Sequence, residues 1–334
     1  MIDIENLKVN FENKVLSSDK IIIVPHKNAD FDAIGSSLGL SLASKKLKKD
    51  SIIIVDDKTY ELDRGVQYII KEAKNEYPIK SKCKYQSDAY KDDLFVLTDV
   101  NKNYLITCND LLTNPEKVIV IDHHEDDENT VKSNNLYIDP KISSASEIVS
   151  KMLLKMKIKI PKNIANYLLA GIYLDTNKLT KNVSSDTLLI ASKLLEQGAQ
   201  TNEVLDLFVE DFDSDRRVQE LVNRTKMITY KIALVLADEK EEYTTKEIAR
   251  TADNGLTYGC DASFAVAKID DDTIAISARS KEKIDCGKIM SEFKGGGNQF
   301  SGAARIKDLS IDEVGNKLVK LLRPNYYIEK TETN

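Results

Sequence analysis

Four short apolar runs, each ending in an acidic or polar residue, constrain the fold of the first half of the chain more than any other feature. They span 21–26 (IIIVPH), 51–57 (SIIIVDD), 93–99 (DLFVLTD) and 117–122 (KVIVID). Short continuous apolar runs are typical of strands that are buried on both faces of a parallel sheet. Stretches with helical spacing lie between them, including 33–47 and 144–156. This alternation predicts an α/β fold with a doubly wound, mainly parallel sheet.

The pattern changes in the second half of the chain. Helical spacing continues at 186–197 and 202–225, and we expect the second stretch to be a helical connector. Beyond it lie strand-like runs (KIALVLAD, ASFAVAKID and TIAISARS) and a final helix near 311–322. These features predict a second, smaller α+β domain. We therefore divide the chain into a first domain at 1–200, the connector at 201–225 and a second domain at 226–330.

Charge and hydropathy restrict the partners of the chain. Its 334 residues carry 48 Lys and Arg against 54 Asp and Glu, which gives a net charge of −6. Long nucleic acids are held by Lys and Arg that neutralise phosphates, so an acidic chain is not expected to bind them. No apolar stretch reaches the roughly 18 residues of a membrane helix, and the N-terminus is too polar for a secretory signal. We expect a cytoplasmic protein without a membrane partner.

The cysteines give no sign of a metal or redox site. Cys83, Cys108, Cys260 and Cys286 are widely spaced. Structural zinc sites and dithiol redox centres need closely spaced cysteine pairs, which this chain lacks. We expect reduced and mostly buried thiols.

All three histidines follow predicted strands, in the company of several aspartates. The set comprises His26, Asp30, Asp32, Asp99, Asp122, His123, His124 and Asp175, the last at the end of the apolar run YLLAGIYLD. A single histidine at a strand end is more often an ordinary hydrogen-bonded residue than a metal ligand. The joint pattern changes that balance, because the carboxyl ends of parallel strands meet at one edge of a sheet. We expect these side chains to converge at that edge.

Charge balance indicates what would hold such a cluster together. Asp30, Asp32, Asp99 and Asp175 would repel one another, and burial would raise their pKa values. Two divalent cations balance the four negative charges. Oxygen-rich ligands with some imidazole and no thiolate favour manganese, with magnesium or cobalt as alternatives. Two such ions can activate a hydroxide for in-line attack at phosphorus, so the pattern predicts phosphoester hydrolysis. Asp122 is expected to orient a neighbouring histidine.

Two features of the second domain suit a phosphate or nucleotide ligand. Arg279 lies at the end of the run TIAISARS, where it would be either a phosphate anchor or a solvated surface arginine. Gly295, Gly296 and Gly297 precede Asn298. Consecutive glycines allow the backbone to approach a ligand closely, and a flexible turn is the alternative interpretation.

At these residues the sequence resembles the DHH phosphoesterase family with its DHH-associated C-terminal domain. The matching segments follow in order: HKNADFDAIGS, LTDVN, VIVIDHH, AGIYLDTNKLT, and then SARS and GGG. Together they cover about 20–322. Within the family, IDPKISSASEIVSKML, ASFAVAKIDDDTIAISARS and KIM-x3-KGGG are most similar to the catalytic half of bacterial cyclic-di-AMP phosphodiesterases.

The resemblance implies a role for each site residue. One manganese ion would be bound by His26, Asp30 and Asp99, and the other by Asp32, Asp99, His123 and Asp175, with Asp99 as the bridge. His124 would contact the scissile phosphate or assist proton transfer, and it forms the expected catalytic set with Asp99 and Asp122. The distal nucleotide would be held by Arg279, Ser280, Gly295, Gly296, Gly297 and Asn298. Relatives commonly form dimers, so a homodimer is also expected.

Two departures from the family pattern bear on the substrate. Asn298 stands where the family usually has histidine, and Asn101 stands where cyclic-di-AMP enzymes often have one. An amide can donate a hydrogen bond but does not titrate near neutrality. The first hypothesis is a manganese-dependent phosphodiesterase that opens cyclic di-AMP to pApA, with AMP as a further product. The alternatives are hydrolysis of pApA or short oligoribonucleotides (a nanoRNase), a 3′-phosphoadenosine 5′-phosphate phosphatase, and a nucleotide sensor that has lost catalysis.

Overall fold

The protein forms two compact units, Met1–Val209 and Glu210–Asn334. The computed structural model describes residues 2–56, 59, 62–81, 93–209, 212–229, 231–281 and 283–325. Cys108, Cys260 and Cys286 are free and buried, in agreement with the expectation for the thiols. Cys83 lies outside the described residues.

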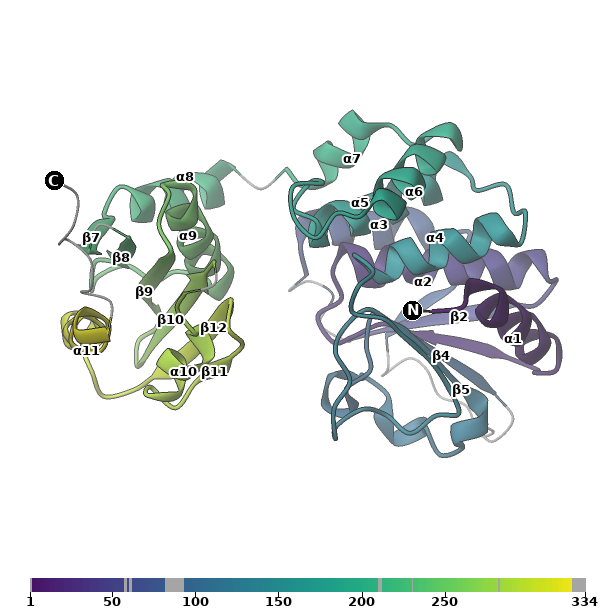
Figure 1. Cartoon of the computed structure of the whole chain (residues 1–334), viewed down its shortest axis with the longest axis horizontal. Coiled ribbons are helices and arrows are strands. Elements are labelled where there is room, and N and C mark those ends of the chain that lie inside the picture. Colours follow the sequence, from purple (N-terminus) through teal and green to yellow (C-terminus); the bar gives the residue numbers. More distant parts are fainter. Residues whose placement is uncertain are drawn as a thin grey trace, which may run out of the picture. The chain divides into compact units, whose positions relative to one another are not determined.

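The first unit is built on a parallel sheet (Figure 1). Its strands are β1 (Ile21–Val24), β2 (Ser51–Val55), β3 (Ile79–Ser81), β4 (Leu94–Thr98), β5 (Val118–Asp122) and β6 (Asn135–Ile138). Its helices are α1 (Ile4–Leu16), α2 (Phe31–Lys46), α3 (Arg64–Ala73), α4 (Ala145–Lys155), α5 (Lys162–Asp175), α6 (Ser185–Glu196) and α7 (Thr201–Leu207). The strand order β3-β2-β1-β4-β5-β6, with every neighbouring pair parallel, confirms the predicted α/β fold.

The strands of this sheet are apolar throughout because both faces are covered. Ile21 and Ile23 of β1 face the core that the helices form, whereas Ile22 and Val24 face a second core. The second core includes side chains from the segment 100–131, which contains short 3₁₀ helices. The strand order reverses between the neighbouring strands β1 and β4. The chain continues from β1 to β2 on one side of this point and from β4 to β5 on the other side. In open α/β sheets, ligands bind at the carboxyl ends of the strands at such a point.

The second unit confirms the predicted smaller α+β fold. Its strands are β7 (Lys226–Thr229), β8 (Ile232–Leu236), β9 (Ala262–Asp270), β10 (Thr273–Ser280), β11 (Gly296–Gly297) and β12 (Ser301–Ile306). Its helices are α8 (Phe212–Val222), α9 (Thr245–Thr257), α10 (Cys286–Ser291) and α11 (Ile311–Asn325). The strands form a sheet in the order β11-β12-β10-β9-β8-β7, in which only β8 and β9 pair in parallel.

The expected continuous helix over 202–225 is wrong. The chain instead forms α7 and α8, and α7 ends before Phe208. The Phe208 ring packs against Phe31 of the first unit, with the ring centroids 4.4 Å apart. Leu221 of α8 belongs to the core of the second unit. The apolar residues of this stretch therefore serve two separate cores, which a single amphipathic pattern in the sequence does not reveal.

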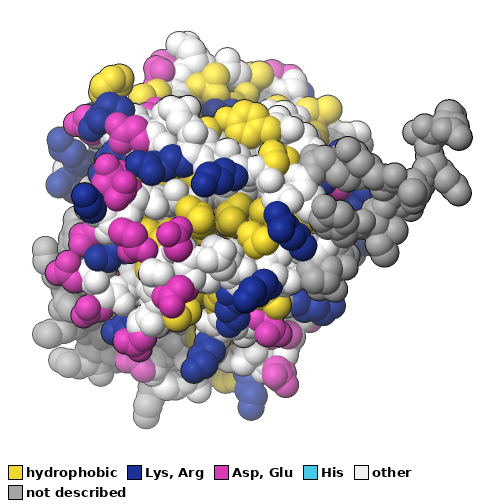
Figure 2. Space-filling view, turned by 90° about the vertical axis from the view of Figure 1, so that its left-hand side faces the viewer, with side chains coloured by type: hydrophobic (Ala, Val, Ile, Leu, Met, Phe, Trp, Pro, Cys, Tyr) yellow, Lys and Arg dark blue, Asp and Glu magenta, His cyan; other side chains and the backbone are white. Residues whose placement is uncertain are grey.

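Acidic and basic side chains are scattered together over the face of the molecule shown in Figure 2, with hydrophobic side chains between them. Despite the net charge of −6, the described residues of this face form no single continuous acidic patch. None of the helices within the described ranges has the length and hydrophobicity that a membrane span requires.

Candidate metal centre

The histidines and aspartates singled out in the sequence come together at the carboxyl edge of the first sheet. His26 follows β1, Asp99 follows β4, and His123 follows β5. Asp30 is the N-cap of α2, and Asp32 lies in the first turn of that helix. Asp122 is the last residue of β5, His124 lies in the loop after it, and Asp175 is the last residue of α5. The structure places these residues in overlapping groups whose possible ligand atoms lie within 4.8 Å of one another. The predicted convergence is therefore present in the fold.

The first group contains His26, Asp30 and Asp99. The Nε2 atom of His26 lies 3.5 Å from Asp30 Oδ2 and 3.4 Å from Asp99 Oδ2. The Nδ1 atom of His26 lies 2.6 Å from the carbonyl oxygen of Lys27, which fixes the proton on Nδ1 and directs Nε2 to the carboxylates. Asp30 caps α2 through Oδ1, which accepts from the amides of Asp32 and Ala33, so its Oδ2 remains toward His26.

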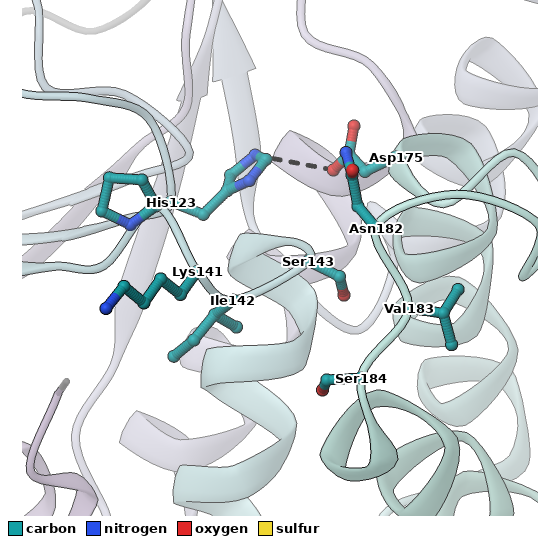
Figure 3. A pocket seen from close by; sticks show the side chains of 9 residues that line it. His123, Lys141, Ile142, Ser143, Asp175, Asn182, Val183 and Ser184 are labelled. Atoms are coloured by element: carbon teal, nitrogen blue, oxygen red, sulfur yellow. Dashed lines mark ion pairs between the residues drawn. The ribbon is translucent and has the colours of Figure 1, made fainter.

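The second group contains Asp32, His123 and Asp175. The Nε2 atom of His123 lies 3.6 Å from Asp175 Oδ2 and 3.9 Å from Asp32 Oδ2, and the first of these pairs is dashed in Figure 3. The same Nε2 lies 3.4 Å from Asp99 Oδ1. Asp99 thus faces the first group with Oδ2 and the second group with Oδ1. It belongs to the first group and also contacts His123 of the second.

The carboxylate of Asp32 is held by the first turn of α4. It is fully buried and accepts hydrogen bonds from the backbone amides of Ala145 and Ser146, both at 2.7 Å. A helix N-terminus favours a negative charge at this place. Helix α5 also approaches closely, because Gly171 has no side chain: a Cβ there would lie 2.6 Å from Asp32 Oδ1 and 2.3 Å from Ser146 Oγ. Sequence reasoning missed these contacts, since any residue supplies a backbone amide.

Asp99 has an unusual backbone conformation. Its φ of 57° lies in the left-handed region, which residues other than glycine rarely adopt, and its amide donates to the carbonyl of Ile121. Such conformations persist where the surrounding structure enforces them, and they gather at functional sites. Here the conformation places a buried carboxylate between the two groups. No sequence signal reports it.

Asp122 lies behind the two histidines that follow it. Its Oδ1 accepts from the backbone amide of His123 at 2.8 Å and faces His124 Nδ1 at 2.9 Å. The His124 ring is otherwise largely exposed, and its centroid lies 4.3 Å from that of the His123 ring. Asp122 is therefore placed to orient His124.

The pKa values within the cluster are shifted in the directions that closely spaced, buried carboxylates produce. Burial raises the pKa of Asp32 to about 7, and the charge on Asp99 adds to this effect. Burial opposes protonation of His123, but Asp99 and Asp32 nevertheless raise its pKa to about 9. Burial and the neighbouring carboxylates raise the pKa of Asp175 well above its usual value. The protein thus concentrates more negative charge at this edge than it can neutralise by hydrogen bonds alone.

Several atoms at this edge that could bind a metal ion also lack hydrogen-bond partners. Three buried atoms make no hydrogen bond to a residue that the structure describes: Asp99 Oδ1, His123 Nε2 and Asp175 Oδ2. Buried polar atoms are nearly always satisfied, so a group of unsatisfied ones needs an explanation. Carboxylate oxygens with imidazole nitrogens are the donors that manganese and magnesium prefer. The residues present therefore fit divalent cations.

A cavity of about 680 Å³ opens beside His123 and Asp175 (Figure 3). Its other walls are the loop 140–143 and the segment 182–184. Glu147 of α4 ties these walls together: its buried carboxylate accepts from Ser143 Oγ at 2.6 Å and Thr187 Oγ1 at 2.8 Å, and it lies 2.6 Å from Lys151 Nζ. Sequence reasoning missed this network, although the spacing of Ser144 and Glu147 is that of a capping box.

In the second unit, the predicted ligand residues are only partly together. Arg279, Gly296 and Gly297 line a cavity of about 420 Å³. Arg279 Nε donates to Asp253 Oδ1 at 2.8 Å. Ser280 is buried, and it is not among the residues that line the cavity. Gly295 and Asn298 are not lining residues either.

The two asparagines that depart from the family pattern have backbone partners. Asn298 Oδ1 accepts from the amides of Phe300 and Ser301, at 2.8 and 2.9 Å, so the side chain closes a turn. Asn101 is buried, and its Nδ2 donates to the carbonyl of His124 at 3.1 Å. Both amides thus stabilise loops in this structure.

Comparison with known proteins agrees with the resemblance seen in the sequence. Residues 20–172 match the DHH family, N-terminal domain, and residues 218–323 match the DHHA1 domain. This chain belongs to the DHH family. As a DHH protein, it is 32% identical over 312 residues to the cyclic-di-AMP phosphodiesterase GdpP of Geobacillus thermodenitrificans, covering 91% of this chain and 47% of that protein. It is also 32% identical over 314 residues to GdpP of Bacillus subtilis, with the same coverage.

The DHH chain thus spans about half the length of these curated relatives. Among solved structures, an exopolyphosphatase-related protein from Bacteroides fragilis has the same fold, with a TM-score of 0.81 at 24% identity. The match covers 97% of this chain and 98% of the other.

Proposed function

We propose that this protein is a metal-dependent phosphodiesterase that hydrolyses cyclic di-AMP to pApA, with AMP as a further product. The observation that carries the proposal is the position of Asp99, whose two oxygens face two groups of possible metal ligands, one on each side. The relatives named as cyclic-di-AMP phosphodiesterases, at 32% identity over nine-tenths of this chain, support the choice of substrate.

In this proposal the edge of the first sheet holds two manganese ions, and magnesium or cobalt would also fit. His26, Asp30 and Asp99 hold one ion, and Asp32, Asp99, His123 and Asp175 hold the other. When bound, such a pair supplies a nucleophile at neutral pH and stabilises the negative charge that develops at phosphorus. The cluster around Asp32 is prepared for this role, because two helix amides fix the carboxylate in one orientation.

His124 is the proposed proton donor. The hydrogen bond to Asp122 raises the pKa of His124 above its usual value, against the opposing effect of burial. With Nδ1 directed to Asp122, Nε2 is the ring atom left for the substrate. A protonated imidazole near neutrality can give its proton to the oxygen that leaves phosphorus. Asp122 then acts by keeping the ring in one orientation.

The second unit is proposed to bind the nucleotide farther from the cleaved bond. Arg279 supplies a positive charge at the cavity of about 420 Å³, and Asp253 restrains its side chain. Gly296 and Gly297 leave their backbone accessible in the same cavity. Ser280, Gly295 and Asn298 belong to this proposal as residues that shape the surrounding loops.

A comparison of substrates tests the function. Purified protein with manganese is given cyclic di-AMP, pApA, 3′-phosphoadenosine 5′-phosphate or a five-nucleotide RNA, each at the same concentration, and initial rates are measured. The proposal expects the highest rate with cyclic di-AMP and pApA as the first product. A much higher rate with a linear substrate would reassign the protein to linear nucleotides. Tight nucleotide binding with no turnover of any substrate would instead indicate a sensor.

A further inference from the structure

The cavity beside the metal centre has walls of two kinds. His123 and Asp175 form the wall toward the metal centre. A molecule in the cavity would therefore lie next to a group bound at the metal centre. Pro140, Ile142 and Val183 supply apolar side chains. Ligand pockets typically measure about 300–1,000 Å³ and combine apolar walls with a few polar groups. At about 680 Å³, this cavity has the size and composition of a binding site for a small organic molecule.

Two of its polar side chains are engaged within the protein. Ser143 Oγ donates to Glu147. Ser184 Oγ accepts from the amide of Thr187, as the N-cap of α6. Figure 3 shows Lys141 extending away from Asp175, whereas Asn182 is directed toward it. Asn182 is therefore the polar side chain outside the metal centre that is placed to meet a ligand.

The backbone holds Asn182 in this position. Its φ of 51° is in the left-handed region, which asparagine tolerates better than most residues. The side chain is exposed and makes no hydrogen bond to a residue that the structure describes. Asn177, earlier in the same segment, has a similar φ of 45°, but its Nδ2 donates to Thr180 Oγ1 at 3.1 Å. The two asparagines thus differ in one respect: only the amide beside the cavity is available to a ligand.

We propose that this cavity binds one mononucleotide unit of the substrate and that Asn182 donates a hydrogen bond to it. A phosphodiester held at the metal centre carries a nucleoside on each side, and one of them would enter the adjoining cavity. The apolar side chains of Ile142 and Val183 suit the face of a base, and the Asn182 amide suits an oxygen of the ribose or phosphate. This inference rests on the proposed function, but it concerns binding and can be tested without turnover.

The test is a calorimetric titration of the manganese-loaded full-length protein with 5′-AMP. Asn182→Asp keeps the shape of the side chain and replaces the donor by a negatively charged acceptor. Asn182→Gly removes the side chain at a position where glycine is unstrained. Asn177→Gly is the control, because it also removes an asparagine side chain at a left-handed φ, but outside the cavity lining. Manganese affinity is measured for each variant as a readout of the metal centre.

We expect 5′-AMP to bind about tenfold more weakly to Asn182→Gly, which is the effect of one hydrogen bond to a charged ligand. The loss should be at least as large for Asn182→Asp, because the added carboxylate also repels the phosphate. Manganese affinity of Asn182→Gly should stay within about twofold of the original protein, and Asn177→Gly should leave both affinities unchanged. Unchanged 5′-AMP affinity in the Asn182 variants, or no 5′-AMP binding at all, would overturn the inference. An equal loss of manganese affinity would also overturn it, because Asn182 would then support the metal centre.

The same protein, assayed with cyclic di-AMP, separates this inference from the proposed function. Asn182-dependent binding of 5′-AMP without hydrolysis of cyclic di-AMP would retain the subsite and reject the phosphodiesterase. Hydrolysis of cyclic di-AMP that is insensitive to both Asn182 variants, with 5′-AMP binding also unchanged, would retain the enzyme and reject the subsite.

Discussion

The two candidate sites of this molecule are built in opposite ways. At the metal centre, side chains supply the chemistry and the backbone of neighbouring elements holds them, as the first turn of α4 holds Asp32. In the cavity of the second unit, the backbone itself is exposed, because Gly296 and Gly297 contribute no side chain. The metal centre should therefore be sensitive to changes of charge that keep the shape of a side chain. The glycine segment should be sensitive to the addition of a single carbon atom at Gly297.

The largest effect is expected for Asp99→Asn. Asparagine keeps the size and tolerates the left-handed backbone of this position, but it removes the charge that both donor groups share. Hydrolysis of cyclic di-AMP should fall by about 10³-fold, the upper range for loss of one electrostatic group in an active site. Bound manganese, measured by equilibrium dialysis, should fall with it. Asp126→Asn, on an exposed loop, is the control and should change neither quantity.

Removing the network that joins the walls of the cavity beside the metal centre should cost stability. Glu147→Ala leaves Lys151, Ser143 and Thr187 without their shared partner. Breaking a buried ion pair by removing one partner costs about 3 kcal/mol, so the denaturant midpoint of the first unit should fall. Glu196→Ala, which breaks an exposed pair with Lys193, should change stability by no more than about 0.5 kcal/mol. Equal effects of the two substitutions would contradict a supporting role for Glu147.

The second unit offers a matched pair of glycines. Gly297 has a φ of 148°, and a Cβ there would lie 2.2 Å from the carbonyl oxygen of Ser301. Gly297→Ala should therefore cost about 2 kcal/mol of stability and raise the KM for the nucleotide. A Cβ at Gly296 meets no atom within 4 Å, so Gly296→Ala should leave stability within about 0.5 kcal/mol of the original. A reversed order would show that the loop is not held in the conformation described.

The last expected effect concerns the pH dependence of metal binding. The carboxylates raise the pKa of His123 to about 9, whereas a metal ion binds only the neutral ring. Manganese must therefore displace a proton, and its affinity should rise about tenfold per pH unit up to pH 9 for each proton displaced. Below about pH 7, manganese must also displace a proton from Asp32, because burial raises the pKa of this carboxyl group to about 7. Calorimetry in two buffers with different ionisation enthalpies measures the release. Affinity that stays constant between pH 6 and 8 would contradict this electrostatic account.

Much of the first unit could be predicted because its decisive features are side-chain patterns. The strand runs specified the parallel sheet, and the polar residues after them specified which side chains meet at its edge. The rest depends on the backbone. The amides of Ala145 and Ser146 carry no residue signature, and the left-handed φ of Asp99 follows from tertiary packing.

The stretch 202–225 shows a different limit. Its helical periodicity is real, but Phe208 packs in the first unit and Leu221 in the second. A local pattern does not state which core each apolar residue joins. In the glycine segment, the sequence shows where side chains are missing and leaves open which glycine the backbone requires. The structure distinguishes Gly297 from Gly296 by φ and by the contact that a Cβ would make.

The proposed function depends on two cation sites that Asp99 joins at the edge of the first sheet. Anomalous X-ray diffraction from crystals of the protein soaked in manganese tests it most directly. Two anomalous peaks about 3.5–4 Å apart are expected, one beside His26 and Asp30 and the other beside His123 and Asp175, with Asp99 between them. A single peak, or peaks away from Asp99, would contradict it.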